Sequence, residues 1–328
     1  MEKARVNYVD VAKIVGMFFI VLGHTLRGGK VTTWLYSFHV PLFFFLTGIT
    51  FHYTEYKLKY FIIKKVKTLL IPFYVWSLIS ICIYGIVKNI LPFDISSQLG
   101  AASPVLEILL GYCSLNSPLW FLPCLFVSEL LMWIVLNLKQ KLGAGVIIVS
   151  ILISVLMCFL WPLINEKMVF WNIYNAIILS PFSLMGLWVG KKFKSIPFTT
   201  KGSIFSCFLL VVGGVVGTFV NHQIGYLGCY YGNPLLFYFS ACLSIIGITY
   251  ICKGFKKAPL ITYFGRNTIH VLLTHKFVIT FFMVCPLIKN YLTHENFFCV
   301  IISLATMSLC YFAGWFISKN KFLATILF

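Results

Sequence analysis

Residues 9–26 read VDVAKIVGMFFIVLGHTL, an apolar stretch that carries Asp10, Lys13 and His24. Its length suits a transmembrane helix, which takes about 20 apolar residues. Eleven residues separate Lys13 from His24, close to three α-helical turns, so the two side chains are predicted to share a face about 16 Å apart along the axis. Ionisable groups are costly inside a bilayer, so a helix that keeps these three is predicted to use them.

The next apolar stretch carries a second histidine. Residues 37–48 read SFHVPLFFFLTG and contain His39. A short connection after the first helix makes the second one run back through the membrane, so His39 is predicted to lie at a depth similar to that of His24. Histidine is the side chain whose ordinary pKa lies closest to neutrality, which suits a general base.

Composition sets the fold class. The 328 residues are 60% hydrophobic and 10% charged, with a mean hydropathy of +0.94, which excludes an ordinary soluble protein. We predict an all-α polytopic membrane protein with about ten spans and one membrane domain over residues 1–328. The 11 cysteines are scattered without a Cys/His ligand spacing, so neither a metal site nor a disulfide framework is predicted. The predicted spans are 9–26, 34–53, 67–87, 118–138, 143–161, 171–190, 203–220, 234–252, 259–280 and 297–318.

The basic residues predict the orientation. Most of the 26 Lys and Arg residues lie on the side of the two termini. Arg266 and Lys276 fall within the ninth span, and five residues fall on the opposite side: Arg27, Lys30, Lys88, Lys167 and Lys289. By the positive-inside rule both termini are predicted to be cytoplasmic. The net charge of +18 is therefore explained by topology, and no nucleic-acid partner is needed.

Five motifs in chain order match one known family. On these motifs the chain resembles the integral-membrane family 3 acyltransferases over essentially its whole length. In three positions Lys stands where the family more often has Arg. The motifs are Lys13-x10-His24, SFHVPLFFFLTG at 37–48, Lys64-x-x-Lys67 followed by LLIPFY at 69–74, PLWFL at 118–122, and FGRNT at 264–268 with His275 beyond.

The resemblance implies a function. Members of this family are bacterial enzymes of the cytoplasmic membrane that O-acylate cell-surface glycans and related acceptors. It implies an O-acyltransferase, with acetyl as the default group, that uses cytosolic acyl-CoA (acetyl-CoA) as donor substrate and holds no bound cofactor. A glycan or glycolipid hydroxyl would be the acceptor. The resemblance places the reactive group at His24, with Lys13 and His39 beside it.

The residues offer a donor site and an acceptor side. Coenzyme A carries several phosphate charges, and Lys64 and Lys67 belong to a cytoplasmic cationic cluster that suits them. Arg266 is a third candidate for donor binding. On the outer side, Trp120 and the tyrosines of loop 221–233 suit a sugar. Asp10 and His275, both inside predicted spans, complete the candidates.

Each assignment has a structural alternative. His24 could cap a helix end, and His39 and His275 could be buried, hydrogen-bonded histidines. Lys13 could extend to the cytoplasmic interface beside Asp10. The loop lysines could serve only as topology signals, and Trp120 as an interfacial anchor.

A transporter of a small polar or anionic solute is the alternative function. Such a protein would place polar groups in broken helices at matched repeat positions, and no repeat is visible here. A lipid-linked glycosyltransferase is disfavoured because the first outer loop, 27–33, has no acidic residue. A soluble-type His-x4-Asp acyltransferase is excluded because no histidine has that spacing. The sequence therefore favours an enzyme over a transporter.

Overall fold

The computed structural model describes residues 7–26, 28–51, 57–87, 103–164, 170–220, 224–226, 230–285 and 296–328. Within these ranges the chain is helical, apart from turns and an isolated bridge between Gly225 and Tyr230. Several residues used above to predict orientation or span ends lie outside the described residues: Arg27, Tyr53, Lys88, Lys167 and Lys289.

The helices follow the predicted spans in order. The longer ones are α1 (Asn7–Thr25), α2 (Lys30–Thr50), α4 (Ile71–Val87), α6 (Phe121–Leu142), α7 (Gly145–Ile164), α8 (Ile173–Ser195), α9 (Thr200–Val215), α10 (Pro234–Ile251), α12 (Thr268–Val284) and α14 (Asn296–Ser318). The shorter ones are α3 (Leu58–Lys65), η2 (Val66–Leu70), α5 (Pro104–Leu109), η4 (Ser114–Trp120), η5 (Phe170–Asn172), η6 (Val216–Val220), η8 (Cys252–Gly254), α11 (Pro259–Arg266) and α15 (Lys321–Leu327).

Length and hydropathy identify the spans. Seven helical stretches of the described chain are long and apolar enough to cross a membrane, and an eighth is possible if α11 and α12 form one bent span. The segments predicted as spans two and five are helical as well, as α2 and α7, but they do not belong to this set. The protein is therefore a helical multi-pass membrane protein, while the count of ten and the orientation stay predictions.

Three breaks in the helices fall beside candidate site residues. The predicted ninth span, 259–280, bends by 67° where α11 meets α12, next to Arg266. A five-residue π-helical turn, η2, contains Lys67 and joins α3 to α4. The 3₁₀ segment η4 ends at Trp120, where α6 begins. Irregular turns of this kind often mark functional positions in helices.

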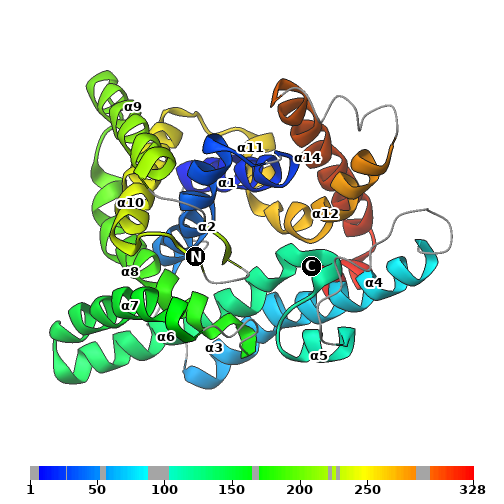
Figure 1. Ribbon diagram of the computed structural model, residues 1–328, viewed down its shortest axis with the longest axis horizontal. Coiled ribbons are helices and arrows are strands. Elements are labelled where there is room, and N and C mark those ends of the chain that lie inside the picture. The colour runs from blue at the N-terminus through cyan, green and yellow to red at the C-terminus, as the bar shows by residue number, and fades with distance from the viewer. Residues whose placement is uncertain are drawn as a thin grey trace.

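Helices α1 and α2 form the centre of the bundle (Figure 1). α2 packs on α8 and α10, while α1 packs on α11, α12 and α14. The contact between α2 and α8 is backbone to backbone, since a Cβ built on Gly48 would lie within 2 Å of the Ser183 carbonyl oxygen. A Cβ on Gly186 of α8 would meet the Phe45 carbonyl oxygen at 2.0 Å. Small residues allow this close approach inside membranes.

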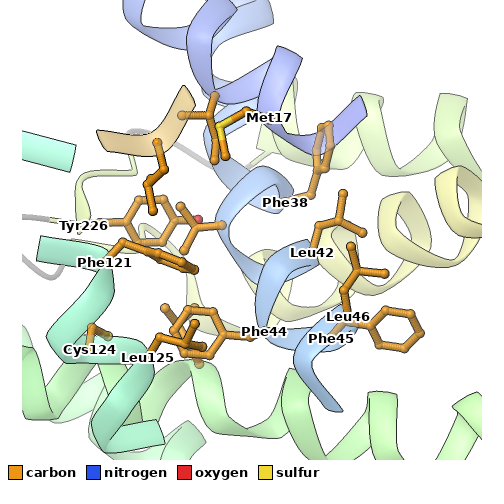
Figure 2. Close-up of a cluster of buried hydrophobic side chains, with 14 of the residues drawn as sticks. Met17, Phe38, Leu42, Phe44, Phe45, Leu46, Phe121, Cys124, Leu125 and Tyr226 are labelled. Atoms are coloured by element: carbon orange, nitrogen blue, oxygen red, sulfur yellow. The ribbon is translucent and has the colours of Figure 1, made fainter. Parts of the chain in front are cut away.

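The core lies around α2. Figure 2 shows Phe44 of α2 packed toward Phe121 and Leu125 of α6, with Phe45 directed to the other side of the helix. Phe44 and Phe45 are completely buried. The ring centroids of Phe44 and Phe121 lie 5.7 Å apart at an interplanar angle of 85°, the edge-to-face arrangement that aromatic pairs prefer. This packing fixes the position of α2 and of His39 upon it.

Candidate functional site

A cavity of about 180 Å³ lies at the His24 end of α1. We call it the histidine pocket. α1 contributes His24, α2 contributes Tyr36 and His39, η4 contributes Trp120, and the segment around Gly225 contributes Tyr226. The two histidines that the sequence placed at similar depth therefore line one cavity, although they come from different helices.

Hydrogen bonding defines the protonation of two histidines. The Nδ1 atom of His39 lies 2.5 Å from the carbonyl oxygen of Leu35, and that of His275 lies 2.7 Å from the carbonyl oxygen of Val271. A carbonyl oxygen only accepts, so Nδ1 carries the proton in each ring. In the neutral imidazole Nε2 then holds a lone pair and is able to take up a proton.

Three imidazoles gather here from three helices. The ring centroids of His24 and His275 are 5.4 Å apart. The ring centroid of Tyr36 lies 6.4 Å from that of His24 and 4.8 Å from that of His39. His275 is completely buried, and its Nε2 atom has no hydrogen-bond partner among the described residues. His24 is only partly buried and lines the pocket directly. The arrangement places proton acceptors on one side of the cavity.

Aromatic rings also line the histidine pocket, and that of Tyr226 lies 6.0 Å from the His39 ring between centroids. Trp120 and Tyr226 stack with centroids 5.6 Å apart and an interplanar angle of 21°. The Tyr226 hydroxyl donates a hydrogen bond of 2.5 Å to the carbonyl oxygen of Tyr36. Trp120 is 7% exposed, so it lies inside the protein beside His24 and His39. Parts of loop 221–233, at 221–223 and 227–229, lie outside the described residues.

A second cavity, of about 250 Å³, lies at the Lys13 end of α1. We call it the lysine pocket. Lys13 of α1, Thr47 and Thr50 of α2, and Lys64 and Lys65 of α3 line it, together with Glu129 of α6 and the rings of Phe51 and Phe61. Lys13 and Lys64, assigned separately from the sequence, therefore meet in one cavity.

An ion pair that the sequence did not indicate crosses the lysine pocket. The Lys65 ammonium lies 2.5 Å from a carboxylate oxygen of Glu129, whose side chain is 4% exposed. The signal was present, because Glu129 is an acidic residue within an apolar helix. Lys65 could not be distinguished from its neighbours by sequence, since five lysines crowd residues 57–67.

The remaining candidates lie elsewhere. Lys67 is exposed on η2 and does not line the lysine pocket. Arg266 is exposed at the end of α11. Asp10 is buried where α1 meets α11, since a Cβ built on Gly265 would lie 2.4 Å from its Cβ. Asp10 thus belongs to the contact between α1 and α11, and Arg266 follows Gly265 at the bend.

The two pockets share one pair of helices. Lys13 and His24 are eleven residues apart on α1, and Thr50 and His39 are eleven residues apart on α2. At 1.5 Å per residue each pair spans about 16 Å along its helix. Because α1 and α2 pack against each other, the pockets lie at the two ends of the contact between these helices. We call this contact the seam. The described residues contain no group of three or more His, Cys, Asp or Glu placed to hold a metal ion.

Comparison with known proteins identifies the family. A family model for an acyltransferase domain, that of acyltransferase family 3, matches residues 6–317. Comparison with curated proteins and with solved structures gives no match. The family match covers nearly the whole chain and includes both pockets. The chain therefore belongs to acyltransferase family 3 and is a multi-pass membrane acyltransferase.

Proposed function

We propose that the protein moves an acyl group, acetyl by default, from cytosolic acyl-CoA to a hydroxyl of a cell-surface or lipid-linked glycan. The observation that carries this proposal is the pairing of the two pockets along α1 and α2. One end of the seam gathers cationic side chains, and the other gathers imidazoles and stacked aromatic rings. A two-substrate transfer between an anionic donor and a sugar requires both environments.

The lysine pocket suits the phosphate groups of CoA. Three ammonium groups, those of Lys13, Lys64 and Lys65, line it together with the single carboxylate of Glu129. Lysine ammonium groups bind phosphate as point charges rather than in a bidentate fashion. By the positive-inside rule this end of α1 faces the cytosol, where acyl-CoA is found. With the phosphates held there, the thioester arm extends along the seam toward His24.

The histidine pocket suits the transfer itself. We assign His24 as the general base, with His39 and His275 as the neighbouring imidazoles. The base takes the proton of the acceptor hydroxyl as its oxygen attacks the thioester carbonyl carbon, which forms the C–O bond. The C–S bond then breaks, and the CoA thiolate takes the proton back from the imidazolium to leave as a thiol. Trp120 and Tyr226 offer stacked faces for the sugar.

Mass spectrometry of surface glycans tests the proposal. Glycans from cells that carry the gene should be heavier by one acyl group per modified sugar than those from a deletion strain. Re-expression of the wild-type chain should restore the shift. Identical glycan masses in the two strains, together with no turnover of acyl-CoA by the purified protein, would refute the proposal. Flux of a solute in proteoliposomes under the same conditions would instead favour a transporter.

A further inference from the structure

Between the two pockets, the side chains of Leu42 and Phe43 both pack against Gly16 of α1, and Phe43 is the aromatic one. On α2, Val40 lines the histidine pocket and Thr47 lines the lysine pocket. Phe43 falls between them at spacings of three and four residues, which places all three on one helical face. On α1, Gly16 takes the same intermediate place between Lys13 and Ile20.

Contacts hold the Phe43 ring between two helices. A Cβ built on Gly16 would lie 3.0 Å from the Cε2 atom of Phe43, so the ring rests directly on the α1 backbone. On its other side the ring centroid lies 6.0 Å from that of Phe121, at an interplanar angle of 74°. Phe121 itself lines the histidine pocket. The ring therefore fills the section of the seam just beneath that pocket.

The packing of Phe43 differs from that of its neighbours. Leu42, Phe44 and Phe45 are completely buried, whereas Phe43 is half-buried. A close-packed core side chain is held in its rotamer by the atoms around it. A ring with open space on one side has room to change rotamer, and such changes are fast. Phe43 is thus the least enclosed side chain among these four consecutive residues.

We infer that Phe43 separates the lysine pocket from the histidine pocket and determines which acyl groups cross between them. The identity of the cargo rests on the proposed function, in which a thioester arm extends along this seam. In the observed rotamer the ring closes the seam. When it turns aside, it vacates the place that its Cε2 atom occupies beside Gly16, next to the buried side chain of Leu42. Short acyl groups pass through this place, and longer or branched ones do not.

The first experiment measures the path without using enzyme activity. Ile20→Cys places a thiol in the histidine pocket, and a charged methanethiosulfonate reagent is added from the Lys13 side in oriented membrane vesicles. The parent protein without Ile20→Cys gives the background, to which the exposed Cys82 and Cys207 contribute. We expect Phe43→Ala to make the thiol at position 20 react several-fold faster.

Phe45→Ala is the matched control. It removes the same ring from the same helix, but Phe45 is directed away from Phe121 and from the seam (Figure 2). In the double variant Ile20→Cys with Phe45→Ala, the thiol at position 20 should react as fast as in Ile20→Cys alone. Equal reactivity with and without the Phe43 ring, or equal acceleration by Phe45→Ala, would overturn the separating role. Phe43→Leu provides a milder variant that should show a smaller acceleration, should Phe43→Ala fail to accumulate.

The second experiment measures selectivity among acyl-CoA donors. Wild type and Phe43→Ala are compared in kcat/KM for acetyl-CoA, butyryl-CoA and hexanoyl-CoA. We expect the ratio of hexanoyl to acetyl transfer to rise several-fold in Phe43→Ala. Normal acetyl transfer with an unchanged ratio would refute the selecting role and leave the proposed function intact. No transfer from any donor by the wild type would refute the proposed function, while the thiol labelling still decides whether Phe43 closes the path.

Discussion

Lys65, the sequence neighbour of Lys64, forms an ion pair across the lysine pocket. Both line the cavity, but Lys65 is bound to the buried carboxylate of Glu129, and its side chain is 23% exposed. Sequence alone predicts a basic cluster here but does not distinguish its members. What distinguishes them is the direction of each side chain around α3 and the presence of Glu129 on α6, more than sixty residues away.

His24 provides the sharpest prediction at the scale of a single residue. We expect His24→Ala and His24→Gln to be produced at normal levels and to lose acyl transfer, since a positioned base typically contributes about 10²- to 10⁴-fold in rate. Glycan mass spectrometry and a membrane immunoblot measure the two quantities. His270→Gln is the matched control, because His270 lies on α12 outside the histidine pocket. Near-wild-type acylation by His24→Gln would make His24 a structural residue.

The ion pair between Lys65 and Glu129 predicts an asymmetry in stability. Lys65→Met leaves a carboxylate buried without its partner, which costs about 3–5 kcal/mol in comparable buried pairs. The double variant Lys65→Met with Glu129→Met removes both charges and should recover most of that loss. Thermal unfolding in detergent gives the comparison. A Lys65→Met protein as stable as the wild type would show that Glu129 is stabilised by other groups.

At the scale of the element, α3 and η2 separate two lysines that the family motif treats alike. Both lysines are exposed, but Lys64 lines the lysine pocket and Lys67 does not. We expect Lys64→Ala to weaken acyl-CoA binding and Lys67→Ala to leave it nearly unchanged. The difference should shrink as salt rises, since the Debye length is about 8 Å at physiological ionic strength. Equal affinities for all three proteins in an equilibrium binding assay would reduce both lysines to signals of orientation.

The contact between α2 and α8 makes a second prediction at this scale. Gly48→Ala drives a methyl group into the Ser183 carbonyl and should lower the melting temperature by forcing the two helices apart. Gly85→Ala is the control, because a Cβ at Gly85 meets nothing within 4 Å. There the change should be neutral or stabilising by about 0.5–1 kcal/mol, the usual gain of Ala over Gly inside a helix. Similar melting temperatures for the two variants would contradict the close packing.

The sequence predicted where the helices lie better than where they bend or begin. Hydropathy placed every long helix, because burial in lipid depends on the local apolar run. It did not indicate the 67° bend between α11 and α12, which falls within the predicted span 259–280. It also began the third span at Lys67, whereas the helical stretch begins at Leu58. Bends and extensions depend on tertiary contacts such as that of Gly265 with Asp10, which no local pattern reports.

For the whole molecule, the distribution of positive charge predicts the orientation. Single cysteines introduced near Tyr60, Ser195 and Phe255 should be labelled from the cytoplasm, and those near Gly28 and Tyr230 from outside. A membrane-impermeant thiol reagent, used before and after permeabilisation, makes the distinction in a background whose exposed native cysteines are replaced. Labelling at position 230 only after permeabilisation would invert the assignment of the two pockets to the two sides of the membrane.

The glycines that bring α2 against α8 have a consequence for motion. Because the backbones touch at Gly48 and Gly186, a roll of α2 about its axis would turn larger side chains into α8. We therefore expect α2, which carries His39 and Phe43, to keep its position against α8, unlike the helices of transporters that work by rocking one bundle against another. If Phe43 separates the two pockets as we propose, we expect structures with and without donor to superpose over these two helices and to differ in the χ1 angle of Phe43.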